Sequence, residues 1–168
     1  MNLSGPLLQK ILGFTIALLI SCRLSAEPIM QPLSVITGWN LLGNGVASTL
    51  DVASVFGDAS KINSVWKWNA SARRWAFYSP QVAAQGNLAS YASANGYDVL
   101  ATVAAGEGYW VNAQTPASFA NRSGEAHGLN ALRFVAGWNL VTSGRDLCAA
   151  ALNRSLSGRT SGAPENST

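Results

Sequence analysis

Aromatic residues alternate with small or polar ones in the middle of the chain, which predicts a β hairpin. Residues 65–68 (Val-Trp-Lys-Trp) and 75–78 (Trp-Ala-Phe-Tyr) are strand-like, and the polar residues between them form the connecting loop. Pairing Trp68 with Trp75 places Trp66 opposite Phe77, which brings all four rings to one face of the hairpin. Pro80 ends the second strand because it has no backbone N–H to donate.

Other short apolar runs are separated by glycine-bearing turns. Residues 50–56 and 88–95 predict short helices, and Gly96 ends the second. Residues 97–100 and 109–112 predict two more strands. The pattern therefore predicts a mainly β fold with two or three short helices, with an α+β arrangement as the alternative. It is expected to be a single small domain of antiparallel strands that includes the aromatic hairpin.

Two stretches that lie 99 residues apart carry the same apolar pattern. Residues 33–42 (Leu-Ser-Val-Ile-Thr-Gly-Trp-Asn-Leu-Leu) align without a gap to residues 132–141 (Leu-Arg-Phe-Val-Ala-Gly-Trp-Asn-Leu-Val). Leu, Gly, Trp, Asn and Leu are identical in the two copies. Each copy predicts a strand followed by a glycine-bearing turn and a short helix, over residues 50–56 in the first copy and 146–153 in the second.

This repeat divides the chain into three parts after its N-terminal segment. A β-rich repeat unit covers residues 33–131, and a partial second copy covers residues 132–153. The remaining residues, 154–168, are mostly Ser, Gly, Thr and other polar types, and they are expected to be disordered. The second copy either completes the first unit as an added strand or belongs to a truncated tandem array.

The N-terminal pattern is that of a secretory signal over residues 1–26. Lys10 precedes an unbroken apolar stretch over residues 11–20, which is about half the length that crosses a bilayer. Two processing routes remain open. Signal peptidase would cut after Ala26, whereas the run Leu-Ile-Ser-Cys ending at Cys22 resembles a bacterial lipobox, in which Cys22 becomes a lipid anchor. The mature chain is accordingly expected to be extracytoplasmic, either secreted or periplasmic, or lipid-anchored at the cell envelope.

The charge pattern excludes nucleic-acid binding. The chain is 48% apolar and 11% charged, with a net charge of +3. Removal of Lys10 and Arg23 with the signal leaves nine of the 11 Lys and Arg residues against eight Asp and Glu residues, and no basic cluster remains. Nucleic-acid binding needs several phosphate contacts from such a cluster. Membrane contact is expected only through the signal segment or a lipid anchor.

No catalytic or metal-binding set is apparent. The only His, His127, lies in a glycine-rich loop, and Ser64 and Lys67 have the spacing of some acyl-enzymes but lie in a predicted strand. Cys148 lies in an apolar run and is expected to be a small buried residue. The acidic residues are scattered, at Asp51, Asp58, Asp98 and Glu107 among others. We therefore expect no enzyme activity, no cofactor and no metal.

The aromatic hairpin is the candidate binding site. Trp66, Trp68, Trp75 and Phe77 share one predicted face, on which exposed rings would stack on the faces of sugars. Rings that alternate along a strand are also typical of a buried core, where each buries 150 to 250 Å². Both interpretations remain open at this point.

Three segments carry a resemblance to a known module. Gly38-Trp39-Asn40-Leu41, then Val65-Trp66-Lys67-Trp68 with Trp75, and finally Gly106-Glu107-Gly108-Tyr109-Trp110-Val111 resemble a module that recurs, often in tandem, in bacterial secreted and surface proteins. That module opens on Gly-Trp-Asn-Leu and closes on Gly-x-Gly-Tyr-Trp-Val. The resemblance covers roughly residues 33–114. It implies an exported accessory or surface domain but assigns no site residues. The expected function is an exported noncatalytic interaction module at the surface or in the periplasm, with a glycan or an envelope protein as partner, and the alternative is a carbohydrate-binding module.

Overall fold

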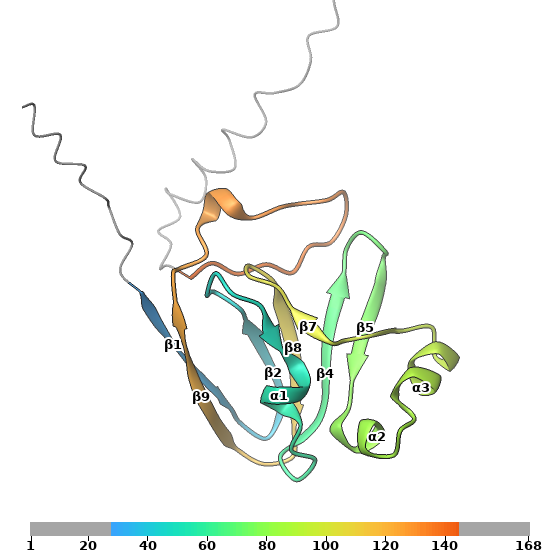
Figure 1. The fold of residues 1–168 in the computed structure, drawn as a ribbon. Coiled ribbons are helices and arrows are strands. Elements are labelled where there is room, and N and C mark those ends of the chain that lie inside the picture. The colour runs from blue at the N-terminus through green and yellow to red at the C-terminus, as the bar shows by residue number, and fades with distance from the viewer. Residues whose placement is uncertain (1–27, 145–168) are drawn as a thin grey trace, which may run out of the picture.

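The computed structural model describes residues 28–144, and it is mainly β with three short α helices (Figure 1). The predicted fold class is therefore confirmed. The elements are, in order, β1 (Ile29–Val35), β2 (Gly38–Gly43), β3 (Leu50–Asp51), α1 (Val52–Phe56), β4 (Ile62–Asn69), β5 (Arg74–Tyr78), α2 (Pro80–Ala84), α3 (Leu88–Ala94), β6 (Asp98–Val99), β7 (Thr102–Val103), β8 (Gly108–Ala113), β9 (Ala117–Gly124) and a 3-10 turn (Leu129–Ala131). The signal segment with Cys22 and Ala26, Cys148, the helix predicted over residues 146–153 and the tail over residues 154–168 lie outside the described residues.

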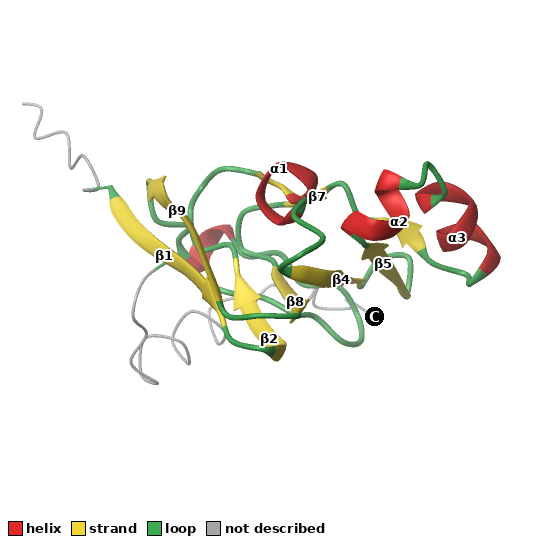
Figure 2. Cartoon of the chain, turned by 90° about the horizontal axis from the view of Figure 1, so that it is seen from below, coloured by secondary structure: helices red, strands yellow, loops and turns green. Residues whose placement is uncertain are grey.

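A five-stranded sheet forms the centre of the fold, in the order β2-β8-β4-β5-β6. Its pairs are antiparallel except for β5 with β6, which is parallel. β1 and β9 form a separate antiparallel pair at one side, and α2 and α3 lie beyond β5 at the other (Figures 1 and 2). A two-residue pair, β3 with β7, lies next to α1.

The predicted hairpin is formed by β4 and β5 in the expected register. Trp68 lies opposite Trp75, and Trp66 lies opposite Phe77. The turn between the strands contains Arg73, whose φ is 52°. Pro80 ends the pairing as predicted and also begins α2, because its fixed φ suits the first position of a helix.

The core lies between one face of the five-stranded sheet and the β1–β9 pair, with α1 beside it. From the sheet it takes Val65, Tyr109 and Val111, and from α1 it takes Phe56, all at most 1% exposed. Leu33 and Val35 enter it from β1. Aliphatic side chains and single rings of Phe and Tyr fill this space, and no Trp is among the buried residues of the described chain.

The predicted strand over residues 33–42 is divided between two sheets. β1 ends at Val35 and β2 begins at Gly38, because the side chain of Asn40 closes a turn between them. The backbone N–H of Ile36 donates to Asn40 Oδ1 at 3.0 Å, and Asn40 Nδ2 donates to the carbonyl of Ile36 at 2.8 Å. Gly38, with φ of 89°, lets the chain turn there. Residues 33–42 therefore join the two sheets.

Candidate functional site

All six tryptophans of the chain lie on the side of the five-stranded sheet that faces away from the core. They are Trp39, Trp66, Trp68, Trp75, Trp110 and Trp138. Alternation along β2, β4, β5 and β8 places five of them there, because neighbouring residues of a strand point to opposite faces. Trp138 lies outside the strands, and its carbonyl accepts a hydrogen bond from Trp68. In the sheet, Trp66 lies directly opposite Trp110. We refer to these six residues as the tryptophan face.

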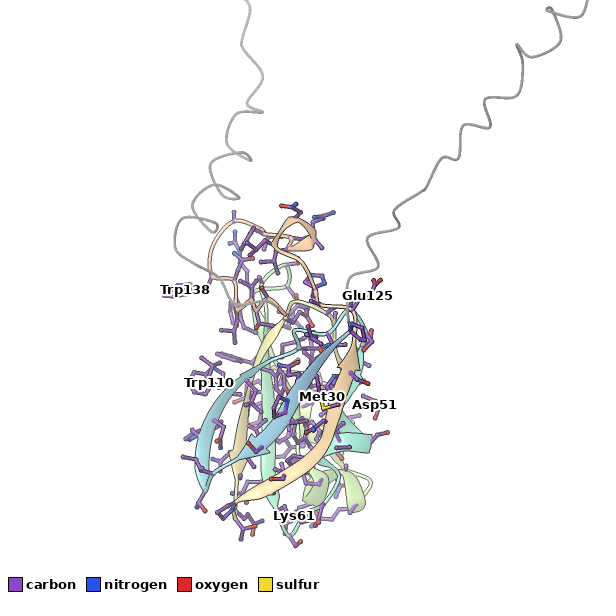
Figure 3. The ribbon with its side chains drawn as sticks, turned by 90° about the vertical axis from the view of Figure 1, so that its left-hand side faces the viewer. Met30, Asp51, Lys61, Trp110, Glu125 and Trp138 are labelled. Carbon is purple, nitrogen blue, oxygen red and sulfur yellow. The ribbon has the colours of Figure 1, made fainter. Side chains whose placement is uncertain are left out.

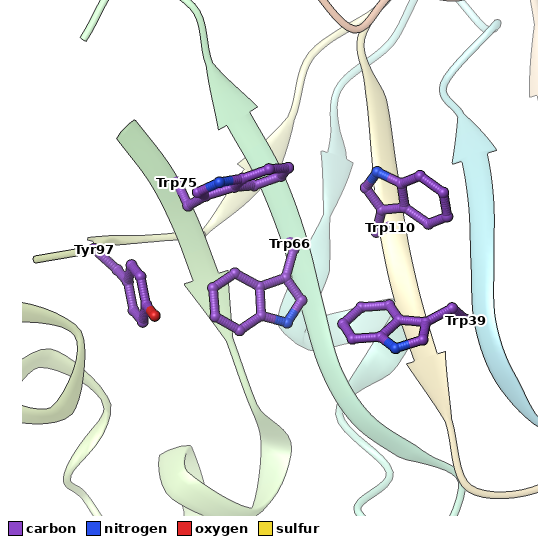
Figure 4. Close-up of a pocket in the computed structure, with 5 residues that line it drawn as sticks. All are labelled: Trp39, Trp66, Trp75, Tyr97 and Trp110. Atoms are coloured by element: carbon purple, nitrogen blue, oxygen red, sulfur yellow. The ribbon is translucent and has the colours of Figure 1, made fainter. Parts of the chain in front are cut away.

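The first of two adjoining pockets on this face has a volume of about 590 Å³ (Figure 4). It is lined by Trp39, Trp66, Trp75, Tyr97 and Trp110. Trp39 contacts Trp110 edge to face, with centroids 6.5 Å apart, and Trp66 contacts Trp75 in the same way at 6.4 Å. The ring of Tyr97 packs against Trp66 at 5.0 Å. These edge-to-face contacts hold the rings in defined orientations around an open space.

The second pocket, of about 390 Å³, shares Trp75 and Trp110 with the first. Its other lining residues are Trp68, Trp138, Asn139 and Leu140. The indole Nε1 of Trp68 donates to the carbonyl of Trp138 at 3.1 Å, which ties the segment around Trp138 to the sheet. Trp110 and Trp138 project on the same side of the molecule (Figure 3). The two pockets thus form one continuous aromatic surface.

The exposure of the rings differs along this surface. Trp39 is 56% exposed, Trp75 is 37% exposed and Trp138 is 86% exposed. Phe77, in contrast, is only 4% exposed, because Tyr91 and Tyr97 cover it at centroid distances of 5.1 and 6.1 Å. Of the four hairpin residues singled out in the sequence, Trp66, Trp68 and Trp75 therefore line the pockets, and Phe77 lies beneath a neighbouring layer of rings.

Hairpin pairing alone did not identify the other members of the surface, Trp39, Tyr97, Trp110 and Trp138. A signal for two of them was present in the sequence. Trp110 lies between Tyr109 and Val111, which are buried, so the alternation that buries its neighbours turns Trp110 outward. The outward orientation of Trp39 follows from the pairing of β2 with β8. That pairing is difficult to predict, because it places Trp39 opposite Asn112, more than 70 positions away in the sequence.

The polar groups of the pockets are mainly indole donors. Trp66 Nε1 donates to Ser64 Oγ at 2.9 Å. The Nε1 groups of Trp39, Trp75 and Trp110 donate to no acceptor within residues 28–144. Neither pocket has a charged side chain among its lining residues. The surface therefore offers ring faces and N–H donors.

The catalytic arrangements considered from the sequence are not brought together. Ser64 accepts from Trp66, whereas Lys67 pairs with Glu107 at 2.8 Å, so the Ser and Lys groups have separate partners. The ring of His127 lies against Gly106, and its backbone N–H donates to the carbonyl of Gly45 at 2.7 Å. Over residues 28–144, no group of three or more His, Cys, Asp or Glu side chains is placed to hold a metal ion.

Four ionisable groups of the described residues, all outside the pockets, have shifted pKa values. Hydrogen bonds from Lys61 and Ser60 lower the pKa of Asp58 to about 2. A hydrogen bond from the backbone N–H of Ser54, at the start of α1, lowers the pKa of Asp51. Burial raises the pKa of Tyr78 and of Tyr109 on the core side of the sheet. These shifts have local structural causes and do not identify a reactive group.

Comparison with protein-family models, with curated protein sequences and with solved structures finds no match for this chain. Among the described helices, none has the length and apolar character to cross a membrane.

Proposed function

We propose that this chain is an exported, noncatalytic interaction module at the cell surface or in the periplasm, and that the tryptophan face is its binding surface. The observation that supports this proposal is the placement of all six tryptophans on one face, with none in the described core. Tryptophan is the residue most enriched at the centres of binding surfaces, because it offers a large rigid contact area and one polar donor.

A noncatalytic role is supported by the residues that line the pockets. They are aromatic, apart from Asn139 and Leu140. Catalysis by a side chain needs a nucleophile or a group that transfers protons, and indole, amide and aliphatic groups do neither. Tyr97 is the one phenol in the lining, and neither lining contains a His, Cys, Ser, Asp, Glu or Lys that could act with it. Export is supported by the signal pattern over residues 1–26 and by the resemblance over residues 33–114 to a secreted module.

The second candidate is a carbohydrate-binding module that uses the same face. It is favoured by the ring exposure of Trp39 and Trp75 and by indole N–H groups that have no acceptor within the described residues. Flat exposed rings contact the apolar face of a sugar, while an indole N–H donates to a hydroxyl oxygen. The lack of charged lining residues restricts this candidate to neutral glycans.

The proposal is tested by combining a glycan array with affinity capture from envelope extracts, using the full chain and three variants. Trp39→Ala and Trp75→Ala each remove one exposed ring from the face. Met30→Ala is the matched control, because Met30 is a 68% exposed apolar residue on β1, away from the pockets. We expect the two tryptophan variants to lose the captured partner and Met30→Ala to keep it.

The readout also separates the two candidates. A glycan that binds and changes the tryptophan emission of the wild-type chain would assign the face to carbohydrate. An envelope protein retained by the wild type and by Met30→Ala, but not by the tryptophan variants, would assign it to a protein partner. Equal binding by all four proteins would show that the tryptophan face is not the binding surface.

A further inference from the structure

The two copies of the repeat form the same local structure. In the second copy the N–H of Val135 donates to Asn139 Oδ1 at 3.0 Å, and Asn139 Nδ2 donates to the carbonyl of Val135 at 2.8 Å. These are the same bonds, at the same distances, that join Ile36 and Asn40 in the first copy. The glycine before the tryptophan has a positive φ in both, 89° at Gly38 and 99° at Gly137. Each copy is therefore shaped by its own Gly-Trp-Asn sequence.

The copies differ in what lies beside them. In the first, β2 pairs with β8 over six residues, from Gly38 opposite Ala113 to Gly43 opposite Gly108. In the second, the strand expected from the sequence is reduced, within the described chain, to an isolated bridge between Val141 and Glu107. Two hydrogen bonds form this bridge, from Gly108 N–H to the carbonyl of Leu140 and from Thr142 N–H to the carbonyl of Gly106, both at 2.9 Å.

Each copy has two backbone edges. The first copy pairs with β8 through one edge, and the second copy contacts the first unit through the other edge. Alternate residues of an extended strand direct their backbone groups to the same edge. Asn44 N–H donates to Glu107, so Asn44, Leu42 and Asn40 face the β8 side. The corresponding residues of the second copy, 99 positions later, are 143, 141 and 139. The hydrogen bonds with Gly106 and Gly108 are instead made by Thr142 and Leu140, which direct their backbone groups to the other edge. The edge that corresponds to the β8-pairing edge therefore points away from the first unit.

At Asn139 and Val141 this outward edge is open within the described residues, and apolar side chains surround it. Within residues 28–144, no backbone hydrogen bond is made by the N–H or carbonyl of Asn139 or Val141. The side chains around them are exposed, to 41% at Val135, 86% at Trp138 and 39% at Val141. An exposed apolar strand edge with unpaired backbone groups is a template for the addition of another strand.

We infer that residues 138–142 are a docking edge for a strand with the Gly-x-Gly-Tyr-Trp-Val sequence, presented by another protein that carries this type of strand. The first copy shows this choice of partner, because its identical Trp-Asn-Leu segment pairs with such a strand, β8. The β8 of this chain is not free for the purpose, since β2 and β4 occupy its two edges. The register of the first copy places Val141 opposite the Tyr of the incoming strand and Leu140 opposite its Trp.

The test measures the binding of a fluorescently labelled synthetic peptide with the sequence of residues 105–114 to the full chain by anisotropy. Val141→Pro removes the N–H that faces the open edge and leaves the carbonyl of Leu140 and the N–H of Thr142 in place. Val141→Thr keeps the N–H and the branched side chain. We expect saturable binding to the wild type and to Val141→Thr, and binding about tenfold weaker to Val141→Pro, because a peptide carbonyl loses its donor.

A matched pair of peptides makes the test independent of the folding of the proline variant. In the first copy, Leu42 directs its backbone to Tyr109, so N-methylation of the peptide at Tyr109 removes a donor aimed at the docking edge. N-methylation at Trp110 removes a donor on the other edge of the peptide. We expect the first peptide to bind weakly and the second to bind like the parent peptide.

Four results would overturn the inference. The first is the absence of saturable binding, or equal binding of a scrambled peptide. The second is equal affinity for wild type and Val141→Pro together with equal affinity of the two methylated peptides. The third is a loss of binding in Trp75→Ala but not in Val141→Pro, which would place the peptide in the aromatic pockets. The fourth is a dimer of the chain alone that Val141→Pro abolishes, which would assign the edge to a second copy.

Discussion

The two faces of the five-stranded sheet are made by alternate residues of the same strands, yet they carry different kinds of side chain. On the core face, Val65 and Val111 are fully buried by β1, β9 and α1. On the other face Trp66 and Trp110 border an open pocket, and Trp39 at the edge of the sheet is more than half exposed. Because both faces are strongly apolar, apolar character alone does not show which face is the core. The size and shape of the side chains make the distinction, since aliphatic groups fill the interior and indoles surround a space.

The largest expected effect separates the faces by stability. Ile62→Ala, at a fully buried position on β4, is expected to lower the free energy of unfolding by about 2–5 kcal/mol, because it leaves a cavity in the core. Trp39→Ala removes a larger side chain, yet it should cost less, about 1–3 kcal/mol, because Trp39 is already 56% exposed and its main ring contact is the one with Trp110. Urea denaturation of both variants measures the difference. Equal losses would mean that the tryptophan face is part of the folding core.

A smaller effect is expected from the buried phenol of Tyr109 on the core face. Burial raises its pKa above the ordinary value of 10.0, so the folded state keeps it protonated where the unfolded state ionises. Its contribution to stability is present below pH 10 and is lost as the pH rises above that value. Tyr109→Phe should therefore flatten the fall in stability above pH 10, as measured by thermal melting across that range. A slope as steep as that of the wild type would contradict the assignment.

The smallest effect is expected from Asp58, which lies on neither face, in the loop before β4. Its pKa is about 2 in the folded protein against an ordinary 3.8, because Lys61 and Ser60 donate to its carboxylate. The stabilisation is present above about pH 4 and is lost as the pH falls toward 2. Asp58→Asn should make the acid limb of the stability curve slightly shallower while it leaves the binding of any ligand unchanged. A change in binding would show that the loop contributes to the tryptophan face.

The fold class and the hairpin could be predicted because both depend on local pattern. The alternation over residues 65–68 and 75–78 is sufficient to set the register of Trp68 with Trp75. The aromatic pockets could be predicted only in part, since they join the hairpin to β2, β8 and Trp138, and these pairings span many residues. The break between β1 and β2 was also not predicted, because it depends on a side chain, Asn40, that bonds back to the backbone of Ile36.

The glycines at the junction of the two copies have a consequence for sequence variation. A Cβ at Gly108 would lie 2.6 Å from Leu140 Cγ, one at Gly106 would lie 2.5 Å from His127 Nε2, and one at Gly43 would overlap Thr142. At Gly43 and Gly108 the obstacle belongs to the second copy rather than to the turn itself. Substitutions at these two positions are therefore epistatic with residues 140–142: larger residues become acceptable at 43 and 108 only in a sequence whose second copy has also changed. The repeat and its glycines should vary together among related sequences.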